Sequence, residues 1–125
     1  MSRGINWFKD IAIEEEVTDY GLGKDTTYNI EYLGGDSTSF SDGNITKYQD
    51  AFKQYGNVTI PYIEYEYYSK PENIKEEFIE PKILSEICNK FLNNPNEKDE
   101  SDIKSTIEWF KEMSDKGYYI SYDNY

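Results

Sequence analysis

The 125-residue sequence has no histidine and a single cysteine. Without histidine the chain lacks the commonest general base, the usual partner of serine and cysteine nucleophiles, and the commonest metal ligand. Hydrolase triads that depend on histidine are therefore excluded. The lone Cys88 cannot form an intrachain disulfide, which fits a reducing cytoplasm. It lies between Leu84 and Phe91 on an apolar helical face, so we predict a core residue and not a reactive thiol.

Long apolar runs are also missing. No stretch of 18 apolar residues occurs, and residues 1–17 contain no apolar core after a basic start. We therefore expect neither a membrane span nor a signal peptide, and we place the protein in the cytoplasm. Hydrophobic residues still make up 37% of the chain and aromatics 17%, enough to form a core. The length fits one domain over residues 1–125.

Basic residues are few. The 13 lysines and arginines stand against 25 acids, giving a net charge of −12. Because phosphate binding requires a basic surface, we do not expect direct binding of nucleic acid. The acids are concentrated: residues 10–42 hold nine acids and one lysine, and residues 61–80 hold six acids and two lysines. A solvated surface explains the net charge, but the concentration in two segments is more informative.

Helical patterns dominate the C-terminal half. Apolar pairs recur at helical spacing through residues 81–93, where Pro81 suits the first turn. A second helix is predicted over residues 102–116, followed by Gly117, which suits the position after a helix end, and by a short closing strand in "YYISY". A shorter helix is predicted in residues 45–56, ending at Gly56.

The N-terminal half favours strands. "TTYNIEYL", residues 26–33, alternates apolar and polar positions as a half-buried strand does. Residues 11–17 favour a strand, although Trp7, Phe8 and Ile11 also permit a helix, and "GGDSTSFSDGN" predicts a turn-rich loop. The sequence thus predicts an α+β fold: a small, mostly antiparallel sheet from the N-terminal half plus a closing C-terminal strand, with the two C-terminal helices packed on one face.

Motifs for chemistry are absent or incomplete. "YGLGKD" lacks the first glycine of a phosphate loop, and Asp25 stands where a serine or threonine would bind magnesium, so we predict a flexible turn. Residues 36–43 and 96–102 offer carboxylates for Ca²⁺ or Mg²⁺ but lack the ligand order of an EF-hand. We predict solvated loops there, and no catalytic residue, metal or cofactor.

The stretch "PYIEYEYYS", residues 61–69, combines tyrosines and glutamates. If it is extended, Ile63, Tyr65 and Tyr67 form the core side. The opposite side then presents Tyr62, Glu64, Glu66 and Tyr68 outward. Tyrosine is enriched at interfaces, and acids favour basic partners, so this side is a candidate recognition surface. Negative charge on an edge strand also prevents aggregation, and this alternative remains open.

These patterns lead to a hypothesis of function. We expect a small acidic inhibitor that blocks a basic, nucleic-acid-handling protein, by analogy with phage anti-defence proteins such as anti-CRISPRs and DNA mimics, and with toxin immunity proteins. The predicted partner-binding residues are Glu14, Glu15, Glu16, Asp19, Tyr62, Glu64, Glu66 and Tyr68. The alternatives are a small enzyme that uses carboxylates or a metal, and an oligomeric accessory or adaptor protein. No membrane partner is expected, and the oligomeric state stays open.

Overall fold

The computed structural model describes residues 3–40, 42–97 and 101–124. Its elements confirm the predicted α+β class, with both C-terminal helices and the closing strand present. In chain order they are β1 (Arg3–Phe8), β2 (Asp10–Asp19), β3 (Lys24–Leu33), β4 (Asp36–Phe40), α1 (Asp42–Gly56), the 3-10 helix η1 (Ile74–Glu77), α2 (Pro81–Asn93), α3 (Ser101–Asp115) and β5 (Tyr119–Asn124). No described helix has the length and apolar character needed to cross a membrane.

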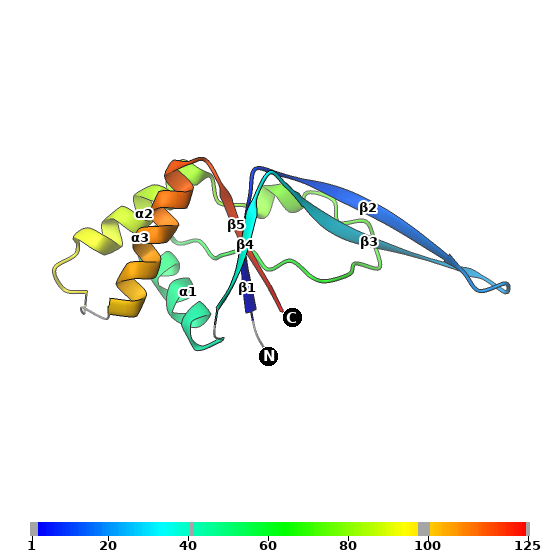
Figure 1. The fold of residues 1–125 in the computed structure, drawn as a ribbon, viewed down its shortest axis with the longest axis horizontal. Helices are drawn as coiled ribbons and strands as arrows, with labels where there is room; N and C mark the ends of the chain where they lie inside the picture. The colour runs from blue at the N-terminus through cyan, green and yellow to red at the C-terminus, as the bar shows by residue number, and fades with distance from the viewer. Residues whose placement is uncertain (1–2, 41, 98–100, 125) are drawn as a thin grey trace.

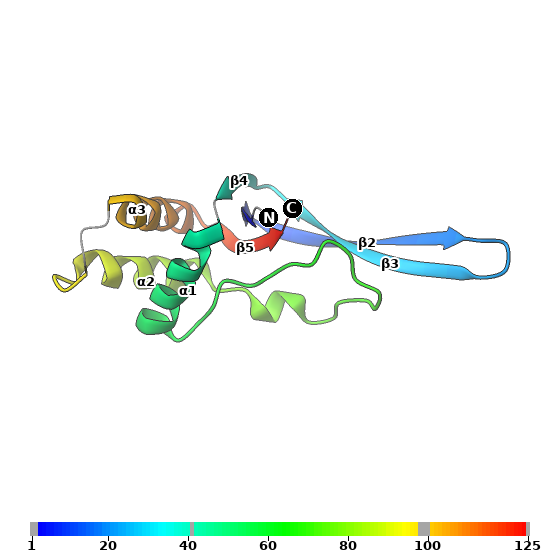
Figure 2. The same ribbon diagram turned by 90° about the horizontal axis from the view of Figure 1, so that it is seen from below.

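The strands divide into two antiparallel sheets. In the first sheet β1 is central, with β4 on one side and β5 on the other. In the second, β2 and β3 pair without interruption from Asp10–Leu33 to Asp19–Lys24. Figures 1 and 2 show this β2–β3 hairpin as a long arm that points away from the three helices. The molecule therefore has a helical end, a central sheet and a projecting hairpin.

The main core lies between the central sheet and the helices. Ile5 and Trp7 of β1 are buried on this side, and the Trp7 ring centroid lies 5.4 Å from those of both Trp109 and Phe110 in α3. Cys88 of α2 is fully buried in the same cluster, which confirms its prediction as a core residue. Burial raises the pKa of its thiol to about 12, so the thiolate needed for reactivity is suppressed.

A second, smaller core anchors the base of the arm. The Phe8 ring lies 5.0 Å from the rings of Tyr32 and Phe78 and 5.9 Å from that of Tyr119. Ile11, Ile63 and Ile74 are buried in the same cluster. The arm is thus fixed at its base, whereas residues 13–25 are all exposed.

The prediction of a turn-rich loop after Leu33 is wrong. Residues 36–40 form β4, which pairs with β1 from Trp7–Asp36 to Arg3–Phe40, and α1 begins at Asp42. The β4 sequence is rich in serine and threonine. Its strand conformation therefore follows from pairing with β1 more than from the intrinsic strand propensity of its residues. Residues 36–40 and 42–43 consequently do not form the solvated loop predicted for them. In the other candidate loop, residues 98–100 lie outside the described residues.

Candidate protein-interaction surface

The two faces of the hairpin differ in chemistry. Directly paired residues share a face, and successive residues alternate between faces. With the observed register, Ile11, Ile13, Val17, Ile30 and Tyr32 lie on one face, which we call the inner face because its base packs on the body. The opposite face carries Glu14, Glu16, Asp25 and Glu31, all exposed, and we call these four residues the acidic face.

Like charges meet on the acidic face. Glu31 raises the pKa of Glu14, first through a hydrogen bond between their carboxyl groups and then through charge repulsion. Among the described residues, no lysine or arginine forms an ion pair with the acidic face. Nearer the body, by contrast, Asp10 binds Lys75 at 2.7 Å, and its pKa is lowered. The acidic face is therefore electrostatically unsatisfied within the described chain.

The four site residues predicted in β2 do not form one surface. Glu14 and Glu16 lie on the acidic face, whereas Glu15 and Asp19 lie on the inner face beyond the part that contacts the body. Sequence reasoning also missed Asp25 and Glu31, which β3 brings beside Glu14 and Glu16. The alternation of side chains along each strand shows which acids share a face within that strand. Grouping acids from both strands also requires the register between β2 and β3, which the sequence did not provide.

Residues 61–68 do not form the predicted strand. Two isolated bridges hold this segment: Tyr62 pairs with Tyr122, and Tyr67 pairs with Tyr28 of β3. The Tyr28 and Tyr67 backbones exchange two N–H···O bonds of 2.8 Å. Between the bridges the chain bends at Tyr65, and the Glu64 N–H donates to the Tyr67 hydroxyl at 3.1 Å. The segment therefore lies against the outer edge of β3, next to the arm.

The side chains of this segment follow the predicted sides only in part. Ile63 is buried, and Tyr62, Glu64 and Tyr68 are exposed, as predicted. Glu66 is half-buried. The assignment of Tyr65 to the core side is wrong, since it is 90% exposed. Side chains alternate between two sides only along a continuous strand, and the bend at Tyr65 interrupts the extended conformation here.

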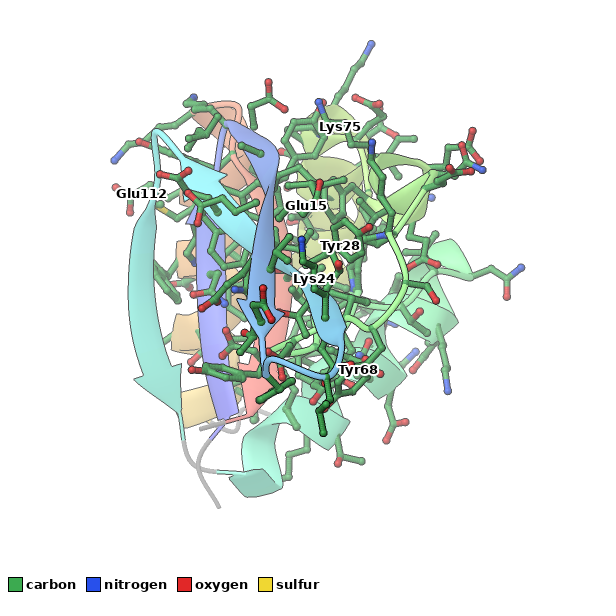
Figure 3. All side chains as sticks on the ribbon, turned by 90° about the vertical axis from the view of Figure 1, so that its right-hand side faces the viewer. Glu15, Lys24, Tyr28, Tyr68, Lys75 and Glu112 are labelled. Carbon is green, nitrogen blue, oxygen red and sulfur yellow. The ribbon has the colours of Figure 1, made fainter. Side chains whose placement is uncertain are left out.

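Exposed apolar side chains gather in the same two segments. Of the nine large hydrophobic residues that are exposed in the described chain, five lie in the hairpin and three in residues 62–68. Val17 is 53% exposed and Tyr20 65%, and Leu22 at the tip is fully exposed. In Figure 3 the arm points toward the viewer, with Glu15, Lys24 and Tyr28 on the hairpin and Tyr68 on the segment beside it. Apolar and acidic groups thus occur together on the arm.

At the tip, residues 20–23 connect β2 to β3. Tyr20 donates its N–H to the Gly23 carbonyl at 2.9 Å, and Gly21 has a φ of 81°. Glycine adopts a positive φ readily because it has no Cβ, so Gly21 allows the chain to reverse direction here. The "YGLGKD" segment is therefore a hairpin turn, in keeping with the prediction of a turn and not a phosphate loop. This turn places Leu22 at the outermost point of the arm.

Comparison with protein-family models, with curated proteins and with solved structures finds no match.

A buried polar cluster lies behind the base of the arm. The Asn6 amide donates to the Asp123 carboxylate at 3.0 Å and lies 3.4 Å from the Tyr32 hydroxyl, which accepts a 3.1 Å bond from Ser121. Burial raises the pKa of Tyr32 to about 12 and raises that of Asp123. These contacts join β1, β3 and β5, so their evident role is to fix the arm to the central sheet. No group of three His, Cys, Asp or Glu side chains suited to a metal occurs in the described residues.

Proposed function

We propose that this protein is an acidic inhibitor that binds and blocks a basic, nucleic-acid-handling protein in the cytoplasm. One observation carries the proposal: the same projecting hairpin holds the acidic face and most of the exposed apolar side chains. Apolar anchors give an interface its affinity, whereas surrounding charge gives it specificity and a fast encounter.

The mechanism follows from this arrangement. The acidic face attracts a positively charged partner over a distance of about 8 Å at physiological ionic strength, the range of screened charges. The exposed side chains of Val17, Tyr20 and Leu22, with Tyr65 and Tyr68 beside the arm, then bury apolar area against the partner. An occupied basic surface is no longer open to phosphates, which inhibits a nucleic-acid-handling protein by occlusion.

The experiment compares three tagged proteins in the same nuclease-treated host lysate: the wild type, an arm variant and a control variant. The arm variant neutralises the acidic face as E14Q/E16Q/D25N/E31Q. The control variant makes an equal change in net charge at exposed acids outside the arm and outside the segment beside it, as D50N/E86Q/E108Q/E112Q. We expect the wild type and the control variant, but not the arm variant, to retain a basic protein.

Inhibition is then measured directly. The retained protein is purified, and its nucleic-acid binding or cleavage is assayed with each of the three proteins. We expect inhibition by the wild type that weakens steeply with added salt, because screening reduces the steering by the acidic face. Equal retention by the arm and control variants, or a retained protein whose activity does not change, contradicts the proposed function.

A further inference from the structure

The outer edge of β2 is an open backbone edge. In an antiparallel pair, alternate residues direct their N–H and C=O groups toward the partner strand and away from it. Tyr28 turns its groups outward to Tyr67, so Glu15, which pairs with Tyr28, must turn its own groups away from β3. The same holds for Ile13, Val17 and Asp19. Within the described residues, no strand pairs with this side of β2.

The usual protections of an edge strand are missing here. Natural edges are kept short, interrupted by a bulge, or marked by proline or lysine. β2 has ten residues, pairs with β3 in an unbroken register, and contains neither proline nor lysine. The outer edge of β3, on the opposite side of the hairpin, is partly protected because Tyr67 pairs with Tyr28 there. Only acidic residues protect β2, and that protection depends on the charge of the incoming strand.

Charge decides which strand can pair with this edge. If a second copy paired antiparallel about Glu15, then Glu15 would oppose its own counterpart and Glu14 would oppose Glu16. Like charges directly opposite one another are destabilising, so self-pairing is disfavoured. A strand with basic side chains beside Glu14 and Glu16, and apolar side chains beside Ile13 and Val17, meets complementary groups at these four positions. Glu15, between Ile13 and Val17 on the inner face, then lies beside an apolar side chain and remains exposed to solvent. On the inner face, Ile13 also lines a surface hollow of ≈ 530 Å³ between β2 and residues 70–76.

We propose that β2 binds its partner by strand addition: an extended segment with alternating basic and apolar residues pairs with the Ile13–Asp19 edge. This inference rests on the proposed function, which supplies the basic partner. It adds the way in which that partner binds, by backbone pairing with β2. Main-chain hydrogen bonds supply affinity in this mode, and the alternating side chains supply specificity. The acidic residues then have two roles, since they repel a second copy and select a basic strand.

The first test measures hydrogen exchange on the wild-type protein. The probe is a capped seven-residue peptide of alternating lysine and valine, and its control is a peptide of the same composition with the lysines in one block. We expect the alternating peptide to slow exchange at the amides of Ile13, Glu15 and Val17, which face outward. The amides of Glu14 and Glu16 face β3 and are already bonded, so their exchange should change little.

The second test uses a matched pair of variants. E15P and E15Q remove the same charge, but only proline removes the outward N–H and crowds the edge. Because that N–H does not take part in the β2–β3 ladder, proline is tolerated in the hairpin. We expect E15P to bind the alternating peptide about tenfold more weakly than E15Q. This is the effect of losing the hydrogen bond from the residue 15 N–H and weakening the adjacent backbone hydrogen bond to the peptide.

The outcomes separate the two proposals. Equal binding of both peptides without protection of the outward amides overturns strand addition but leaves an acidic docking surface. Protection of those amides without peptide, in a concentration-dependent dimer, shows that a second copy occupies the edge and also overturns the inference. No binding of either peptide at low salt counts against the basic partner and thus against both proposals.

Discussion

At the scale of single residues, Gly35 occupies a position with no room for a side chain. A Cβ added there would overlap the Trp7 carbonyl oxygen and lie 2.5 Å from the Phe8 Cα. These backbone atoms belong to the central strand and cannot rotate away, so we expect G35A to lower the unfolding free energy by about 2 kcal/mol or more.

Gly23 provides the matched control for this prediction. A Cβ there meets no atom within 4 Å, and its φ is not positive. We expect G23A to change the unfolding free energy by less than about 0.5 kcal/mol. Urea titrations followed by the fluorescence of Trp7 and Trp109 measure both variants, since these rings meet in the core. Equal midpoints for G35A and G23A would show that the turn before β4 is not as tight as described.

Cys88 allows a test of burial by its reactivity. Its thiol has a pKa of about 12 because burial disfavours the thiolate, so alkylation of the native protein at pH 8 should be slower than alkylation in urea by roughly 100-fold or more. The raised pKa of Cys88 also makes the unfolding free energy depend on pH in the alkaline range. Stability is unaffected below the ordinary thiol pKa, and it falls as the pH rises from about 9 toward 12, because the unfolded chain loses this proton first. Comparable alkylation rates with and without urea would place Cys88 outside the core.

Some residue environments were predictable from the sequence. The burial of Cys88 followed from helical periodicity, and the position of Gly117 followed from the glycine preference after a helix end, where it has a φ of 87°. The exposure of Tyr65 was not predictable, because alternation has meaning only within a paired strand. Sequence periodicity predicted the exposure of a side chain where residues nearby in the sequence determine it. It failed where the exposure depends on pairing with a strand that is distant in the sequence.

At the scale of elements, the acidic face lowers the stability of the hairpin that carries it. Glu31 raises the pKa of Glu14, so the charged form of Glu14 is disfavoured beside Glu31 in the folded hairpin. We expect E31Q to raise the midpoint of thermal unfolding at pH 7 while weakening binding to a basic partner. The increase in the unfolding midpoint should become smaller as the pH falls. At low pH Glu14 is protonated in the wild type as well, so its repulsion from Glu31 is already absent and the substitution has less to relieve.

Glu112 supplies the comparison for E31Q. It is an exposed glutamate of α3 that forms a 3.2 Å ion pair with Lys116. Neutralising it removes an attraction, so E112Q should not raise the unfolding midpoint. Calorimetry of both variants at pH 7 and pH 4 checks the sign. A midpoint for E31Q at or below that of the wild type would show that the Glu14–Glu31 repulsion is absent in solution.

Elements with strong local patterns were found from the sequence, and those defined by pairing were not. The amphipathic helix over residues 81–93 coincides with α2, and alternation over residues 26–33 located β3. β4 was missed because its serine- and threonine-rich residues form a strand only through β1. The strand expected at residues 62–68 has the composition of a strand but only two bridges to its neighbours. Tertiary pairing outweighed local preference in both cases.

At the scale of the whole molecule, the candidate surface depends on how remote segments combine. The concentration of acids in residues 10–42 was visible in the sequence, but the grouping of Glu14 and Glu16 with Asp25 and Glu31 required the hairpin register. Residues 61–68 indeed lie beside the arm, where Tyr67 pairs with Tyr28. Charge and composition therefore located the region, whereas topology selected which of its residues face the same way.

The arm and the body should be separable in a shortened protein. Every buried residue of the two hydrophobic clusters lies outside residues 17–26. Glu16 and Thr27 are directly paired, and they follow the outward-facing pair Glu15–Tyr28, so they belong to the pairs whose backbone groups face each other. An Asn-Gly type I′ turn can therefore join them. We expect this variant to keep the circular dichroism spectrum and cooperative unfolding of the wild type. It should lose most of its binding to the partner, because Val17, Tyr20, Leu22 and Asp25 are removed together. A shortened protein that unfolds like the wild type and still binds fully would place the partner on the body instead.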